Sequence, residues 1–332
     1  MNERWKMLQA TILLIMISVL SFGDLLGAGA TFPQPLYSKM FAVYQQEKGV
    51  RVNYQGVGSG AGKRQLVEKV VDFGGTDAFM TDKEIQDAGA MVLNIPICIG
   101  AVVLSYNLPG NPDLKLTPEL VSKIFSGAIT KWEDPQIAAV NPNVKLSGDI
   151  FVIFRSESSG TTSIFTDYLA QIDKDNWRMT STFATKSKMA VGARGNAGVA
   201  GLIKQIPGAI GYTEIAYAMQ NNMKYASVQN RSGNFIVPTL ASTSAAANVD
   251  IPADTRASIV NTSARDGYPI VGFTWIMVWQ DMTHNPKGKQ VVDLLKWMIT
   301  GGQVYTSELI YAPLPKSTVD KAQVLINSIK VR

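Results

Sequence analysis

Three short segments of the chain combine small residues, hydroxyl side chains and the start of a helical pattern. They are "GAGATFPQPLYSKM" (27–40), "QGVGSGAGKRQL" (55–66) and "FRSESSGTTSIF" (154–165). A helix start offers backbone N–H groups without intrahelical partners and the positive end of the helix dipole, which together attract anions. One such segment alone is more often a simple cap, with Thr31, Ser59 or Thr161 bonded to its own helix. Three of them favour one shared anion site.

Two charged residues restrict which anion would fit. Arg155 ends the apolar segment "IFVIF" directly before the third loop, where its guanidinium can pair with two oxygens of an oxyanion. Asp77, in "GGTDAFM", would repel an anion unless that anion carries a proton that the carboxylate can accept as a hydrogen bond. Phosphate has such a proton near neutral pH and sulfate does not, which can give a discrimination of about 10⁴ to 10⁵. The alternatives are an ordinary ion pair for Arg155 and a local backbone bond for Asp77.

The second segment also matches, by count, the glycine pattern of dinucleotide-binding folds. Gly56, Gly58 and Ala61 fit that pattern, and Asp77 lies near the position of a ribose-binding carboxylate. However, the preceding strand, "VNYQ", is amphipathic, whereas a central parallel strand is usually a continuous apolar run. A Walker loop would need a glycine at Val57 and a hydroxyl residue at Arg64. The pattern therefore favours a small anion, with a dinucleotide-dependent oxidoreductase as an alternative.

Strand-like and helix-like segments alternate along the 332 residues, which predicts an α/β fold. The predicted strands are "VRVNYQ", "VDFGG", "CIGAVVLSYN", "IFVIFR", "AIGYTEI" and "PIVGFTWIMVW". The predicted helices are "PLYSKMFAVYQQEK", "TPELVSKIFSG", "SIFTDYLAQI", "GVAGLIKQI" and "KQVVDLLKWMITGG". Two long apolar strands, near 95–106 and 268–279, would join two lobes if they cross between them. The stretch 239–269, rich in small polar residues, is expected to run over the surface.

The N-terminus has the features of an export signal. Arg4 and Lys6 precede an apolar run from Met7 to Leu20, and small residues follow, so we expect a signal peptide over residues 1–23. A permanent membrane anchor is the alternative, but the run is short for a spanning helix. The basic residues are spread along the chain without interleaved aromatic residues, which argues against a nucleic-acid surface.

Cysteine and histidine are nearly absent from the sequence. Cys98 is the only cysteine and lies in an apolar run, which predicts a buried thiol and excludes an internal disulfide. His284 is the only histidine, which disfavours zinc sites and Ser/His or Cys/His catalysis. We therefore predict no catalytic residues, no metal site and no cofactor.

Six motifs, in order and at similar separations, resemble the periplasmic phosphate-binding proteins (PstS type) of the phosphate-specific ABC transporter. They are "GAGATFPQPLY", "VNYQGVGSGAG", "VDFGGTDA", "ITKWEDPQIAAVNP", "FRSESSGTTSIFTDYL" and "PGAIGYTEIAYA". The resemblance implies a two-lobed periplasmic-binding-protein (type II) fold, in which each lobe is a mixed sheet flanked by helices and the ligand lies in the cleft. We expect residues 24–96 and 273–332 to form lobe 1 and residues 97–272 to form lobe 2.

Carried over position by position, the resemblance implies a set of phosphate ligands. They are Thr31, Phe32, Ser59, Asp77, Arg155, Ser159, Gly160 and Thr161. The third loop departs from the family, where an Asp-Gly pair is common and Glu157-Ser158 stands here. The longer acid could alter how Arg155 is held, and serine restricts the turn more than glycine would. Ala197 also stands where the family often has an acid.

The predicted function is the capture of inorganic phosphate outside the cytoplasm and its delivery to the membrane permease of an ABC transporter. We expect a periplasmic monomer that binds no nucleic acid and catalyses no reaction. The alternatives are an exported phosphatase or phosphoryl-transfer enzyme, because a phosphate site can be a product site, and a binder of another oxyanion.

Overall fold

The structure is a computed structural model that describes residues 23–332. The predicted signal peptide, residues 1–23, lies outside the described residues except for Gly23, so it stays a prediction. Within the described range, no helix has both the length and the apolar character needed to cross a membrane.

One mixed sheet extends through the described part of the chain, with nine strands and the order β2-β1-β3-β12-β4-β8-β6-β7, and β9 pairs with β4 at its side. The strands are β1 (Leu25–Gly29), β2 (Val52–Gly56), β3 (Phe73–Thr76), β4 (Val92–Tyr106), β6 (Phe151–Arg155), β7 (Ala190–Ala193), β8 (Ala209–Glu214), β9 (Lys224–Tyr225) and β12 (Val271–Trp279). A small second sheet contains β5 (Lys115–Leu116), β10 (Ser227–Gln229) and β11 (Phe235–Ile236). The mixed pairing confirms the predicted α/β class.

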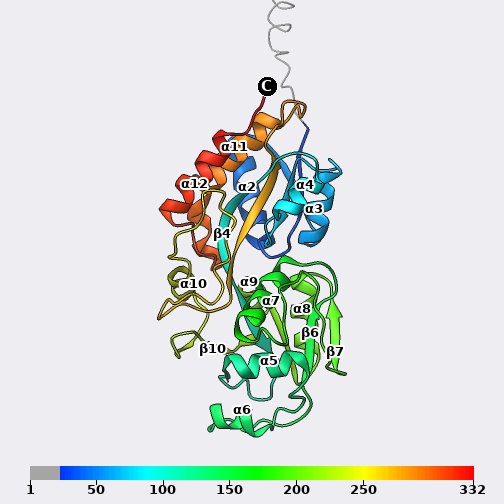
Figure 1. Ribbon diagram of the computed structural model, residues 1–332, viewed down its shortest axis with the longest axis vertical. Coiled ribbons are helices and arrows are strands. Elements are labelled where there is room, and N and C mark those ends of the chain that lie inside the picture. The colour runs from blue at the N-terminus through cyan, green and yellow to red at the C-terminus, as the bar shows by residue number, and fades with distance from the viewer. Residues whose placement is uncertain (1–22) are drawn as a thin grey trace, which may run out of the picture.

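The long strand β4 belongs to two lobes. Its first part pairs with β12 as far as Ala101, and from Val102 onward it pairs with β8. Every residue of β4 is buried, as expected for an apolar strand covered on both faces. In Figure 1, β4 and β12 run from the upper lobe, which holds β1 to β3, toward the lower lobe, which holds β6 and β7. The two-lobed fold is thus confirmed, while the boundaries at 96/97 and 272/273 stay predictions.

The helices divide between the lobes in the same way (Figure 1). Lobe 1 carries α2 (Gln34–Lys48), α3 (Ser59–Val67), α4 (Asp82–Asp87), α11 (Gly288–Met298) and α12 (Lys316–Asn327). Lobe 2 carries α5 (Pro118–Ser126), α6 (Pro135–Val140), α7 (Gly160–Ile172), α8 (Gly195–Gln205) and α9 (Ile215–Gln220). Two short 3₁₀ helices, η1 (Gly301–Tyr305) and η2 (Ser307–Leu309), follow α11. Each predicted strand and helix corresponds to one of these elements.

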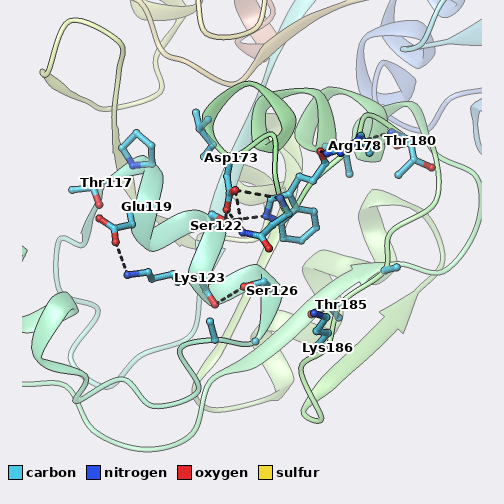
Figure 2. A pocket seen from close by; sticks show the side chains of 18 of the residues that line it. Thr117, Glu119, Ser122, Lys123, Ser126, Asp173, Arg178, Thr180, Thr185 and Lys186 are labelled. Carbon is cyan, nitrogen blue, oxygen red and sulfur yellow. Dashed lines mark hydrogen bonds and ion pairs between the residues drawn. The ribbon is translucent and has the colours of Figure 1, made fainter.

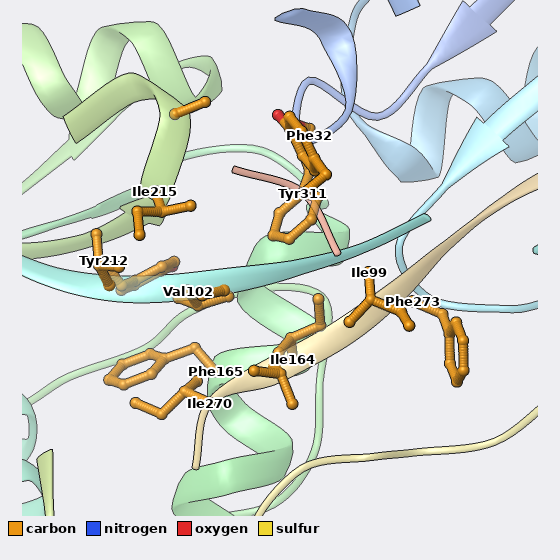
Figure 3. Close-up of a cluster of buried hydrophobic side chains, with 14 of the residues drawn as sticks. Phe32, Ile99, Val102, Ile164, Phe165, Tyr212, Ile215, Ile270, Phe273 and Tyr311 are labelled. Carbon is orange, nitrogen blue, oxygen red and sulfur yellow. The ribbon is translucent and has the colours of Figure 1, made fainter. Parts of the chain in front are cut away.

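A continuous apolar core connects the lobes at β4. Figure 3 shows Phe32 and Tyr311 on one side of this strand and Phe165 and Ile270 on the other, all buried. The C-terminal segment also lies against β4 here, since Ala312 forms an antiparallel bridge with Ile99. The loops that precede α2 and α7 are therefore anchored in one packed layer.

Two segments differ from the sequence-based expectation. Residues 27–29, predicted to belong to the first loop, are part of the strand β1. Small residues let this strand approach its neighbour, because a Cβ on Gly27 would lie 2.3 Å from the Phe73 ring. The stretch 239–269 contains α10 (Leu240–Ala246) and buries Ile251, Ile259 and Tyr268, so the expectation of a purely superficial segment was wrong. Its apolar residues are too widely spaced to form a recognisable period.

Candidate functional site

The three predicted loops meet between the lobes. Each precedes a helix, as predicted, and each follows a strand: β1 leads to α2, β2 to α3, and β6 to α7. The strands before the second and third loops were predicted, and β1 was not. Since β1, β2 and β3 are parallel, their carboxyl ends lie at one edge of the sheet, and Asp77 follows β3 at that edge. The eight residues predicted to bind a ligand are all buried there: Thr31, Phe32, Ser59, Asp77, Arg155, Ser159, Gly160 and Thr161.

Ser59 links the lobes directly. Its Oγ accepts hydrogen bonds from the backbone N–H of Asp77 in lobe 1, at 3.2 Å, and of Gly160 in lobe 2, at 3.1 Å. A Cβ on Gly160 would lie 2.5 Å from Ser59 Oγ and 2.6 Å from Asp77 Oδ2. Only glycine therefore permits this approach of α7 to the first lobe.

Thr31 makes the second contact between the lobes. Its Oγ1 accepts from the backbone N–H and from the Nδ2 of Asn196, at 3.2 and 3.0 Å. Tyr217 Oη donates to the Thr31 carbonyl at 2.5 Å. Asn196 is the second residue of α8, and the small-residue segment "GARGNAGVA" (192–200) that contains it forms a fourth strand-to-helix connection, from β7 to α8. That composition was the signal in the sequence, although we did not include Asn196 in the site.

Arg155 is held by Glu157, the residue that departs from the family pattern. Its Nε donates to Glu157 Oε1 at 3.0 Å, and Nη2 forms a second bond to the same oxygen. That oxygen also accepts from the N–H of Gly195 at 3.0 Å, while Arg155 Nη1 donates to Thr161 Oγ1 at 3.2 Å. The longer acid thus fixes the guanidinium with its Nη1 edge toward Thr161. Ser158 has no positive φ, so serine introduces no backbone strain here.

The capping alternative does not describe the three hydroxyls. Helix α2 has Pro33 as its cap and α3 has Gly58, neither with a side-chain cap bond, and α7 is capped by Ser159, which accepts from Thr162 N–H at 3.2 Å. Thr31, Ser59 and Thr161 instead each accept two N–H bonds from other elements or from Arg155. Because both lone pairs of each oxygen are used, the hydroxyl hydrogen is left to donate.

The backbone of the loops that precede α2 and α7 also offers N–H donors. Among residues 23–332, the N–H of Phe32 has no protein acceptor within hydrogen-bond distance. In the first turn of α7, at the positive end of its dipole, the N–H groups of Gly160 and Thr162 are bonded to Ser59 and Ser159, while that of Thr161 has no acceptor within residues 23–332. The donors outnumber the acceptors, which suits an anion with several oxygens.

Asp77 is the acceptor in this set of donors. Its Oδ1 receives a hydrogen bond of 2.9 Å from Thr274 Oγ1, in β12. Beside Thr274 the register of β12 against β4 shifts, because Thr274 pairs with Cys98 and Trp275 with Pro96, which leaves Ile97 of β4 as the extra residue of a bulge. Burial raises the pKa of Asp77 from 3.8 to about 7, against the opposing effects of the Thr274 bond, the Arg155 charge and the Ser59 bond.

This pKa makes stability depend on pH. Between the ordinary value of 3.8 and about 7, the folded state binds more protons at Asp77 than the unfolded chain, so the free energy of unfolding falls as pH rises and levels off above about 7. We therefore compare the free energy of unfolding of Asp77→Asn with that of the parent, both free of anion. The difference in favour of the variant should increase by about 1 to 4 kcal/mol as the pH rises from about 4.5 to 8. Urea unfolding at both pH values measures this gain.

The control for this experiment is Asp266→Asn, which replaces an exposed carboxylate away from the site and should change the free energy of unfolding by less than about 0.5 kcal/mol. A pH-independent effect of Asp77→Asn would contradict the assigned pKa.

A buried acid lies behind the site. Glu214, at the end of β8, accepts from Ala216 N–H at 2.8 Å and lies 2.9 Å from Tyr311 Oη, which also donates to the Phe32 carbonyl at 2.7 Å. Burial raises the pKa of Glu214 well above its ordinary value. Through Tyr311, the Glu214 side chain links β8 to the C-terminal segment and to the first loop. The raised pKa favours the uncharged form of Glu214, which adds no second negative charge near the candidate anion site.

A cavity of about 1210 Å³ lies on lobe 2 (Figure 2) and contains none of the predicted site residues. Its polar groups bond to one another, since Trp177 Nε1 donates to Ser122 Oγ at 2.9 Å and Asn176 Nδ2 donates to Asp173. A cavity of about 370 Å³ adjoins Ser59 and Ser158 at the edge of the site, and one of about 30 Å³ adjoins Asp77. In the described range, no group of three His, Cys, Asp or Glu side chains could hold a metal ion.

Comparison with known proteins identifies the relatives of this chain. Residues 20–300 match a family model described as the PBP superfamily domain. The phosphate-binding protein PstS of Haemophilus influenzae is 37% identical over 301 residues, covering 88% of this chain and 89% of that protein. The phosphate-binding protein PstS of Methanocaldococcus jannaschii is 34% identical, covering 83% of this chain and 78% of that protein.

A solved structure matches over a similar length. It is described as a high affinity periplasmic phosphate-binding protein (PfluDING) bound with phosphate at pH 8.5. It is 25% identical, has a TM-score of 0.77, and the match covers 91% of this chain and 93% of that chain.

The fold defines a two-lobed solute-binding protein, and the buried donors between its lobes form a candidate anion site. Within that class, the chain belongs to the PBP superfamily and to its family of phosphate-binding proteins named PstS. The resemblance first found in six short motifs is thereby confirmed.

Proposed function

We propose that this protein binds inorganic phosphate between its lobes. The observation that carries the proposal is one buried acceptor, Asp77, among donors from both lobes. The proposed ligands are Thr31, Phe32, Ser59, Asp77, Arg155, Ser159, Gly160 and Thr161. Hydrogen bonds to a charged group contribute about 1.5 to 3 kcal/mol each, so several of them can exceed the cost of removing phosphate from water.

Asp77 distinguishes an anion that carries a proton from one that does not. Its carboxylate lies with Oδ2 close to Gly160 and Oδ1 bonded to Thr274, so one oxygen faces the first turn of α7. A protonated phosphate oxygen can donate to Asp77, whereas sulfate would place an unprotonated oxygen against it. The carboxylate therefore selects phosphate over sulfate.

Binding serves transport in this proposal and no reaction follows it. The relatives named PstS are phosphate-binding proteins, and the solved relative is described as periplasmic. By analogy, residues 1–23 export the chain, and the mature monomer delivers phosphate to the permease of an ABC transporter. The lobes, residues 24–96 with 273–332 and residues 97–272, open and close about β4 and β12.

Calorimetric titration of phosphate-free protein with phosphate and with sulfate tests the proposal. We expect tight binding of phosphate and little or no heat with sulfate. No heat with either anion would overturn the oxyanion site, and equal affinity would overturn the role of Asp77. Turnover of a generic phosphate ester would instead support an enzyme.

Closure of the lobes depends on Gly60, which faces Ser158 of the other lobe. The N–H of Gly60 points at the Ser158 carbonyl at 3.4 Å, and a Cβ on Gly60 would lie 2.4 Å from Ser158 Oγ and 2.6 Å from Ser158 Cβ. Gly60→Ala should therefore hold the lobes apart and weaken phosphate binding about 10- to 100-fold, because closure costs more. Calorimetry measures this change.

The matched control removes the opposing side chain. In Gly60→Ala/Ser158→Gly, the clash is absent, and we expect phosphate affinity within about threefold of the parent, less than 1 kcal/mol. Equal weakening in the single and double variants would show that the alanine acts inside α3 and not between the lobes.

A further inference from the structure

Asn196 is a buried polar residue at the point where both lobes meet the anion site. It lies in the first turn of α8, has no exposed surface, and contacts four other residues through its side chain and N–H. Two of these, Thr31 and Thr161, are proposed phosphate ligands, and two, Thr213 and Glu214, belong to β8.

The orientation of its amide follows from an obligatory donor. The backbone N–H of Glu214 points at one end of the amide at 3.0 Å, so that end must be the oxygen. Thr213 Oγ1 donates to the same oxygen at 3.1 Å. The NH₂ group therefore faces the anion site, where its two hydrogens reach Thr31 Oγ1 at 3.0 Å and Thr161 Oγ1 at 3.1 Å.

Each of these hydroxyls then has its lone pairs occupied by N–H donors. Thr31 Oγ1 also accepts from the N–H of Asn196, and Thr161 Oγ1 also accepts from Arg155 Nη1. Neither hydroxyl donates to a protein acceptor anywhere in residues 23–332. A hydroxyl that can only donate suits an anion, whereas one that is free to rotate must first lose that freedom.

The contacts of Asn196 with Thr31 and with Thr161 differ in whether they join the two lobes. Thr161 and Asn196 both belong to lobe 2, but Thr31 belongs to lobe 1 and meets α8 only when the lobes are together. The donor arrangement at Thr31 is thus completed by closure.

We propose that Asn196 is a positioning residue of the anion site, which directs the hydroxyl hydrogens of Thr31 and Thr161 toward the ligand and joins this orientation to closure of the lobes. The inference rests on the proposed binding of phosphate. It requires no contact between Asn196 and the anion.

Asn196→Asp tests this role, because aspartate keeps the acceptor for Glu214 and Thr213 but loses both donors. The threonine hydroxyls would then turn toward the carboxylate, and we expect phosphate affinity to fall about 30- to 1000-fold. The control is Thr213→Val, which removes a bond on the acceptor side only and should change affinity less than about threefold. Comparable losses in both variants would overturn the proposal, because any disturbance of the amide would then suffice.

A double-mutant cycle separates positioning from charge repulsion. In a Thr31→Val/Thr161→Val background, Asn196→Asp should weaken phosphate binding less than about threefold further, because the hydroxyls through which it acts are gone. The full loss in that background would overturn the proposal in favour of repulsion. If Asn196→Asp does not fold, Asn196→Ala replaces it, in the parent and in the Thr31→Val/Thr161→Val background. A small further loss of affinity in that background supports positioning, and the full loss would overturn the proposal. Absence of phosphate binding by the parent protein would instead reject the proposed function itself.

Discussion

Replacement of Arg155 by methionine is expected to weaken phosphate binding by about 10²- to 10⁴-fold. The guanidinium is buried, is fixed by Glu157, and can form two charge-assisted bonds to an oxyanion. At about 1.5 to 3 kcal/mol for each bond and 1.4 kcal/mol for each tenfold change in affinity, their loss gives this range. Calorimetric or fluorescence titration with phosphate measures it.

The control concerns Glu157, which the substitution leaves without its partner. Without its partner, the half-buried carboxylate of Glu157 would itself repel an anion and destabilise the fold. Arg155→Met/Glu157→Gln removes this charge, and we expect the double variant to recover less than about tenfold of the lost affinity. Full recovery would show that the guanidinium serves only to neutralise Glu157, and normal affinity of Arg155→Met would mean that the anion binds elsewhere.

Asp77→Asn is expected to remove the preference for phosphate over sulfate. The amide retains the shape of the side chain but can donate a hydrogen bond to an unprotonated oxygen, so sulfate becomes an acceptable ligand. A buried acceptor that lacks its donor can account for discrimination of about 10⁴ to 10⁵, and we expect the ratio of the two affinities to fall by at least about 10³. Titration of parent and variant with both anions, near pH 8.5 where Asp77 is ionised, measures the ratio.

The pH dependence provides the internal control for this second result. As the pH falls below about 7, Asp77 becomes protonated and can itself donate to sulfate. The parent protein should then gain affinity for sulfate, while Asp77→Asn should show no comparable gain. A preference that persists unchanged in the variant would place the selection for phosphate in another group.

Much of the site could be predicted because its parts are local in sequence. A strand followed by small residues, a hydroxyl and a helix start has the same physical meaning wherever it occurs, and three such segments indicated Thr31, Ser59 and Thr161. Arg155 and Asp77 stood out because a charge directly after an apolar strand needs a partner. The long apolar strands similarly indicated elements buried on both faces.

Other residues could not be predicted, because their roles arise from contacts between distant parts of the chain. Thr274 reaches Asp77 from almost two hundred positions away because β12 pairs with β3, the strand that Asp77 follows. Glu214 and Tyr311 meet only where β8 and the C-terminal segment converge on the first loop. In the sequence, Asn196 is one polar residue in a glycine-rich segment. Its proposed role follows from its contacts with Thr31, Thr161 and β8, which are far from it along the chain.

Local composition and the periodicity of apolar residues were enough to indicate the class of fold, the loops of the candidate anion site and the charged residues among them. How those loops act together follows from the tertiary structure alone. It brings Ser59 against Gly160 and Thr31 against Asn196, and it buries Asp77 far enough to raise its pKa to about 7. Hydrogen-bond direction and desolvation depend on which groups are neighbours in space, and the order of residues along the chain does not specify those neighbours.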